Sequence, residues 1–143
     1  MNLSKNFTLE ELTVTSSGLS NVPTEMEIEN LTQLANNVLQ PLRDMLGKPI
    51  KVNSGFRSLA VNKTVGGAAT SQHCKGEAAD IENDNNAELF STIREHFSFD
   101  QLIWEGGNNQ QPNWVHVSYI TEGNRMQVLK LKAVNGKNTY VAM

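Results

Sequence analysis

The sequence predicts a single α+β domain, residues 1–143, in which a small antiparallel sheet has helices packed on one side. Three observations favour this class. A long amino-terminal segment repeats apolar residues at helical spacing, and several later segments of four to seven residues have strand character. No repeat, low-complexity tract or linker divides the chain, and 38% hydrophobic residues in 143 suffice for one modest core.

The amino-terminal half predicts two capped helices. Thr8–Glu11 forms a capping box that opens a short helix, and Thr24–Glu27 forms a second one. Gly47 ends the second helix, and Pro41 is expected to kink it. Its apolar face consists of Ile28, Leu31, Leu34, Ala35, Val38, Leu39, Leu42, Met45 and Leu46.

The rest of the chain alternates short strands with two shorter helices. The expected strands span Ile50–Ser54, Ala78–Ile81, Gln101–Trp104, Trp114–Ile120, Gln127–Leu131 and Asn138–Ala142. Ser58 is expected to cap a helix that runs to about Thr64. Asn85 or Asn86 caps another, which ends near His96. Polar, glycine-containing loops separate these elements.

Composition excludes several classes of function. Twelve basic and fifteen acidic residues give a net charge of −3 without a Lys/Arg cluster, so neither nucleic acid nor an anionic membrane is an expected partner. No apolar run is long enough for membrane insertion, and the start has no secretory signal. The single cysteine excludes an internal disulfide framework. We expect a monomer that is made in the cytoplasm.

Two segments carry residues suited to chemistry. In Ser71–Ile81 a loop supplies His73, and a strand of small residues then supplies Asp80, whose burial requires a cation or several donors. In Trp114–Tyr119 the period of two places His116 on the face opposite the valines, which points it into a cleft.

Two histidines and one aspartate, His73, Asp80 and His116, suit a three-ligand zinc site with a fourth position for water. Their spacing alone is a weak signal. The alternative is a structural histidine beside a buried aspartate that it hydrogen-bonds.

The chain resembles a known family from about Leu3 to Tyr119. The motifs that carry the resemblance are Ser54–Ser58, Val65–Gly67, Ser71–His73 with Gly76, Ala78, Asp80 and Ile81, and Trp114–Ser118, with Pro41–Arg43 and Gly47–Ile50 upstream. They are similar to the zinc D-alanyl-D-alanine carboxypeptidases and their phage-type relatives, which include endolysin L-alanyl-D-glutamate peptidases and vancomycin-resistance D-Ala-D-Ala dipeptidases. The resemblance implies an α+β zinc peptidase of peptidoglycan stem peptides, with a fold shared by hedgehog signalling domains.

The resemblance also implies residue roles. His73, Asp80 and His116 match the zinc ligands. Arg57 matches the arginine that binds a substrate carboxylate or carbonyl, for which a capping surface arginine is the alternative. Ser71 and Gln72 match positions near the substrate backbone, for which a role in shaping the loop is the alternative.

One position departs from the family pattern. Many members carry a catalytic Asp or Glu three residues before the last zinc histidine, where this chain has Asn113. Glu105 is the nearest acid, and it faces the zinc only if it lies opposite Trp114 in the strand pair. Otherwise Glu105 is a solvated charge, and Glu122 or a loop carboxylate is the substitute.

Two alternatives to a zinc peptidase stay open. Cys74 could be the nucleophile of a Cys/His peptidase, although only Lys75 beside it would lower its pKa. The chain could also be a catalytically silent zinc-binding module of a phage or cell-surface assembly. The leading prediction is a zinc metallopeptidase that acts on the cell wall after holin release, lysis or virion delivery.

Overall fold

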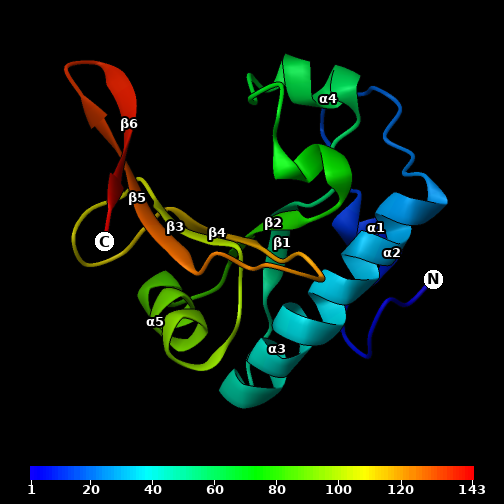
Figure 1. The fold of residues 1–143 in the computed structure, drawn as a ribbon, viewed down its shortest axis with the longest axis horizontal. Helices are drawn as coiled ribbons and strands as arrows, with labels where there is room; N and C mark the ends of the chain where they lie inside the picture. The colour runs from blue at the N-terminus through cyan, green and yellow to red at the C-terminus, as the bar shows by residue number, and fades with distance from the viewer.

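The computed structural model describes residues 1–143, which form a six-stranded sheet with the core helices packed on one of its faces (Figure 1). The helical elements are α1 (Leu9–Leu12), α2 (Glu25–Leu34), the π-helix η1 (Ala35–Leu39), α3 (Gln40–Leu46), α4 (Leu59–Thr64), the 3₁₀ helix η2 (Gln72–Lys75) and α5 (Asn86–His96). The strands are β1 (Lys51–Ser54), β2 (Ala78–Glu82), β3 (Gln101–Glu105), β4 (Trp114–Ser118), β5 (Gln127–Val134) and β6 (Lys137–Ala142). The predicted α+β class is confirmed. No helix has the length and apolar character needed to cross a bilayer.

The sheet is mixed rather than wholly antiparallel, which corrects that part of the prediction. The strand order is β1-β2-β4-β3-β5-β6, and β3 and β5 are the one parallel pair. Because β4 runs antiparallel to β3, it ends beside the start of β3. The short connection 119–126 therefore delivers β5 to the free edge of β3 in the same direction as β3.

The two predicted capping boxes are present and start α1 and α2. The Thr8 side chain accepts from the backbone N–H of Glu11 and the Thr24 side chain from that of Glu27, and each glutamate carboxylate accepts in return from the backbone N–H of its capping residue. The helix that begins at Thr24 runs on through η1 and α3 to Gly47, whose φ of 63° ends it.

Pro41 changes the middle of this long helix. Proline has no N–H and its ring crowds the carbonyl four residues earlier, so a regular α-helical turn cannot continue through it. The chain adopts the wider π-helical turn η1 over Ala35–Leu39, which ends two residues before Pro41. The expected disturbance at Pro41 therefore takes the form of a π-helical turn.

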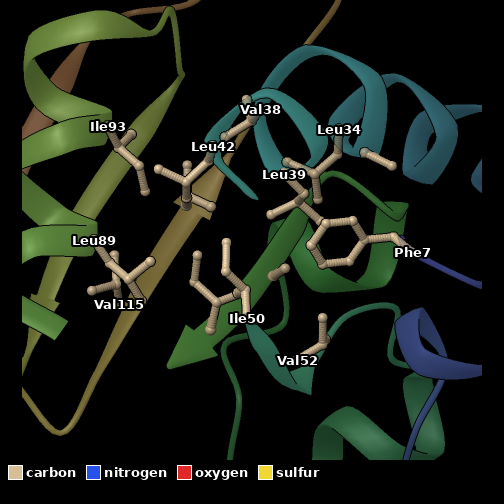
Figure 2. Close-up of a cluster of buried hydrophobic side chains, with 14 of the residues drawn as sticks. Phe7, Leu34, Val38, Leu39, Leu42, Ile50, Val52, Leu89, Ile93 and Val115 are labelled. Carbon is tan, nitrogen blue, oxygen red and sulfur yellow. The ribbon is translucent and has the colours of Figure 1, made fainter. Parts of the chain in front are cut away.

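The hydrophobic core lies between the sheet and the helices α2, η1, α3 and α5. Figure 2 shows side chains of these helices, such as Leu39, Leu42 and Ile93, converging on Val52 of β1 and Val115 of β4. All five are buried. This packing anchors one face of the sheet and leaves the other face available for a site.

Candidate metal centre

Alternation along the strands sends polar residues to the face opposite the core. In β2, Ala79 and Ile81 belong to the core cluster, so Asp80 projects to the other face. In β4, Val115 and Val117 belong to the core cluster, so His116 between them also projects to the other face. Asp80 and His116 are directly paired in the β2–β4 register, so the sheet brings them together.

The loop before β2 adds His73 to this pair. Ser71 caps η2 by accepting a hydrogen bond from the backbone of His73, and Gly76 ends it with a φ of 75°. His73 is buried, and its Nδ1 lies 2.7 Å from the carbonyl oxygen of Gly55. A carbonyl only accepts, so Nδ1 carries the proton and Nε2 keeps a free lone pair.

The carbonyl that orients His73 depends on a close backbone approach. Phe56 donates its N–H to the carbonyl of Leu12 at 2.7 Å, which holds the turn after β1 against the end of α1. A side chain at Gly55 would collide with that same carbonyl. The glycine is therefore required where the turn passes α1, and it fixes the position of the acceptor for His73.

The three side chains form a tight group. Asp80 Oδ1 lies 3.1 Å from His116 Nδ1 and 3.4 Å from His73 Nε2, and all three residues are buried. Ligands bound tetrahedrally at 2.0–2.2 Å are about 3.3–3.6 Å apart. The 3.4 Å spacing lies in this range and the 3.1 Å spacing just below it, and one ligand atom from each of the three residues lies within 4.8 Å of the others, so they can surround one zinc-sized ion. The residues therefore fit a bound metal ion.

Asp80 is held in its ionised form. Burial opposes its charge, but the neighbouring imidazoles of His116 and His73 outweigh that cost and keep the pKa of the carboxyl well below its usual range. Its second oxygen, Oδ2, accepts from Arg57 at 3.2 Å. A charged carboxylate with one oxygen toward two imidazoles is a suitable ligand for a cation.

Arg57 forms hydrogen bonds within the protein that support this centre. Besides Asp80, its guanidinium donates to Ser54 at 3.0 Å and to Asn62 at 3.4 Å, and its side chain is only 16% exposed. It also lines the cleft above the metal ligands. It is therefore not the surface arginine of the alternative interpretation.

Glu105 faces the same cleft. It pairs with Trp114, and Ile103 pairs with His116, so the register is the one that turns Glu105 toward the metal ligands. Burial, with a further contribution from the Asp80 carboxylate, raises the pKa of Glu105 to about 7, while His116 and Arg57 oppose the rise. A carboxyl of this pKa can both accept and donate a proton near neutral pH.

The cleft has a volume of about 620 Å³ and includes Ser71 and Gln72 among its lining residues. Gln72 donates through Nε2 to Asp100 at 2.9 Å, and Arg125 forks onto the same carboxylate through two nitrogens at 2.7 and 3.0 Å. The Arg125 hydrogen bonds lower the pKa of Asp100 to about 2. The sequence analysis identified neither Asp100 nor Arg125 as a residue of the cleft. Asp100 follows the apolar Phe99 and precedes a strand, and an acidic residue among apolar neighbours at a strand was the signal that identified Asp80 as a buried carboxylate.

The other sequence candidates lie away from the metal ligands. Asn113 is exposed at the end of the loop before β4, and Glu122 lines a neighbouring cavity. Cys74 is absent from the cleft lining, and burial raises the pKa of its thiol, which disfavours a thiolate nucleophile. His96 is half-exposed at the end of α5 on the other face of the sheet.

Comparison with known proteins agrees with this geometry. A family model described as peptidase M15 matches residues 5–118, which include all three metal-ligand candidates and Glu105. A zinc D-Ala-D-Ala carboxypeptidase of Streptomyces albus G is 54% identical over 44 residues, which are 30% of this chain and 17% of that protein. The matched stretch is thus about a sixth of the relative's length. The family match covers most of the chain, and the chain belongs to the peptidase M15 family.

Proposed function

We propose that this chain is a zinc metallopeptidase that hydrolyses a peptide bond in peptidoglycan stem peptides. The observation that carries the proposal is the buried group of His73, Asp80 and His116 with Glu105 beside it in one open cleft. The peptidoglycan substrate is supported by the name of the Streptomyces relative and by the motifs shared with that class of enzyme.

His73 and His116 would hold the zinc through ring nitrogens, and Asp80 through Oδ1. Zinc in such a site supplies Lewis acidity, which polarises a carbonyl and makes water a better nucleophile near pH 7. The Gly55 carbonyl keeps the lone pair of His73 directed at the centre, and Arg57 holds the second oxygen of Asp80.

Glu105 would move the proton. Its carboxylate accepts a proton from the attacking water as the new C–O bond forms, and it returns that proton to the amine nitrogen as the C–N bond breaks. A pKa of about 7 suits both steps, because the group is close to half-ionised at the pH where it acts. Glu105 would therefore take the role of the catalytic acid that many family members carry at the position of Asn113.

The loop would bind the substrate. Arg57 is the donor for a substrate carboxylate or carbonyl, and Ser71 and Gln72 lie beside it along the cleft. Because each of these three residues also makes an internal hydrogen bond, each both shapes the cleft and lines it. The monomeric state and the route to the cell wall stay predictions.

Mass analysis of the products tests the proposed function and identifies the bond. Purified peptidoglycan is digested with the zinc-loaded protein, and the soluble fragments are compared with those of an untreated sample. We expect fragments whose masses differ by hydrolysis at one kind of stem-peptide bond. A protein that binds zinc and wall fragments but releases no product would be the silent module instead.

A further inference from the structure

The cleft has two chemically different walls. The loop wall, from Arg57 to Lys75, is mostly polar, and Ala68 is its one apolar lining residue. The other four apolar residues of the cleft belong to the sheet; they are Ile103, Trp114, Leu129 and Tyr140. A peptide in this cleft would therefore meet a mostly polar loop on one side and, on the sheet side, apolar residues beside Asp80, Glu105 and His116.

The apolar wall is built largely by the last two strands. Leu129 pairs with Ile103, and Leu131 pairs with Glu105, so both leucines share the face of the metal ligands. Tyr140 of β6 pairs with Leu131 and extends the row that contains Glu105. We call Leu129, Leu131 and Tyr140 the hairpin shelf; Leu129 and Tyr140 line the cleft, and Leu131 lies between Glu105 and Tyr140 in the sheet. Figure 1 shows the β5–β6 hairpin at the end of the sheet away from α4.

The hairpin shelf is accessible and close to the centre. Tyr140 is 56% exposed, and both leucines are half-buried, so their apolar surface is only partly covered by the protein itself. Tyr140 is also near the carboxylates, since burial first and then Glu105 and Asp80 raise the pKa of its hydroxyl. The shelf lies beyond residue 118, where the family match ends.

We propose that the hairpin shelf binds an uncharged, aliphatic side chain of the substrate next to the scissile bond, with Tyr140 as a specificity-determining residue. The inference rests on the proposed peptidase function. Ile103 lies between His116 and Leu129 in the sheet, and Glu105 lies between Trp114 and Leu131, with Tyr140 next in that row. A peptide whose carbonyl lies at the metal ligands can therefore place a flanking residue over Leu129 and Tyr140, which line the same cleft. Contact with these side chains removes apolar surface from water, which favours an alkyl group over a carboxylate.

Paired synthetic peptides test the proposal once the cleaved bond is known. The two peptides contain that bond and differ in one flanking residue, leucine in one and glutamate in the other, on each side of the bond in turn. For one of the two sides, we expect wild-type kcat/KM to be at least about tenfold higher for the leucine peptide, the order of discrimination that apolar contacts provide.

Tyr140→Ala should remove most of that preference. We expect KM for the leucine peptide to rise about five- to twentyfold with kcat changed less than about twofold, since the ring binds substrate and transition state alike. Tyr140→Phe keeps the ring and should rescue KM to within about threefold of the wild type. Thr139→Ala, on the opposite face of the same strand, is the matched control.

Zinc content and thermal midpoint verify that each variant is folded. The inference is overturned if folded Tyr140→Ala cleaves with the wild-type preference and KM. It is also overturned if Tyr140→Phe loses as much as Tyr140→Ala, because the hydroxyl and not the shelf would then be responsible. A wild type that cleaves neither the peptides nor peptidoglycan would instead overturn the proposed function, and the shelf's role with it.

Discussion

Glu105 of β3 lies directly opposite Trp114 of β4, and this pairing puts its carboxyl on the same face of the sheet as His116. A register shifted by one residue would have sent the carboxyl into the core side. Glu105 is 7% exposed, and the cleft that it lines is the one that contains Asp80 and His116. The relationship makes Glu105 the acid nearest the metal ligands that can exchange a proton with a substrate there.

The first prediction concerns this proton. Glu105→Gln keeps the size of the side chain and removes its titrating group, so we expect zinc and fold to be retained while kcat falls about 10²–10⁴-fold. Steady-state kinetics on a cleaved stem peptide measure the effect. Asn113→Ala is the control, because Asn113 is exposed at the loop end, and it should change kcat far less. Normal cleavage by Glu105→Gln would place the proton shuttle elsewhere.

A second prediction follows from the pKa of Glu105 in metal-free protein. Burial raises this pKa from 4.5 to about 7, so the folded state binds the proton more tightly than the unfolded state does. The contribution of Glu105 to the free energy of unfolding therefore falls as pH rises from about 4.5 to 7, by up to about 3 kcal/mol. It is constant outside that range.

Urea unfolding at several pH values, in chelator, measures this contribution as the difference between wild type and Glu105→Gln. Subtraction removes the titration of residues common to both proteins. We expect the wild type to lose stability relative to the variant as pH rises through this window. If the difference in the free energy of unfolding between the two proteins did not vary with pH, folding would not raise the pKa of Glu105, and the prediction would be wrong.

How much could be predicted from the sequence depends on the range of the interaction. The capping boxes at Thr8 and Thr24 and the alternation around His116 are local, and the structure confirms them. The parallel pairing of β5 with β3 is not local, because it depends on where β4 ends in space. Asp100 and Tyr140 were missed for the same reason, since their partners lie 25 or more residues away or across two strands.

Arg57 illustrates a different limit. The motif suggested a guanidinium free to grip a substrate, but the structure shows it already donating to Asp80 and Ser54. Sequence spacing carries no information on such sharing, because it depends on how the turn after β1 approaches β2. The register of Glu105 was open for a similar reason, namely the length of the loop before β4.

The third prediction concerns zinc itself. The purified protein should hold about one zinc per chain, and His116→Ala should lose it, because two ligands bind far more weakly than three. Zinc at a thousandfold excess over its Kd should stabilise the wild type by about 4 kcal/mol and leave His116→Ala unaffected. Elemental analysis and thermal unfolding measure both. His96→Ala, which removes a histidine at an exposed helix end, should behave as wild type.

The fourth prediction concerns the guanidinium of Arg57. Lysine is a point donor and cannot reproduce a fork, so Arg57→Lys should lower kcat/KM about tenfold or more, equivalent to about 1.4 kcal/mol. Zinc content is measured first, since Arg57 also contacts the ligand Asp80. Arg94→Lys, exposed in α5 across the sheet, is the matched control. Wild-type efficiency in Arg57→Lys would reduce Arg57 to a structural role.

The central claim is that the three-residue centre makes this chain a zinc-dependent peptidase of the cell wall. The most direct measurement is the release of new amino groups from purified peptidoglycan by zinc-loaded protein, by protein stripped of metal, and by stripped protein given zinc again. We expect release by the first and third samples and none by the second. Equal release by all three, or no release by the zinc-loaded protein, would contradict the claim.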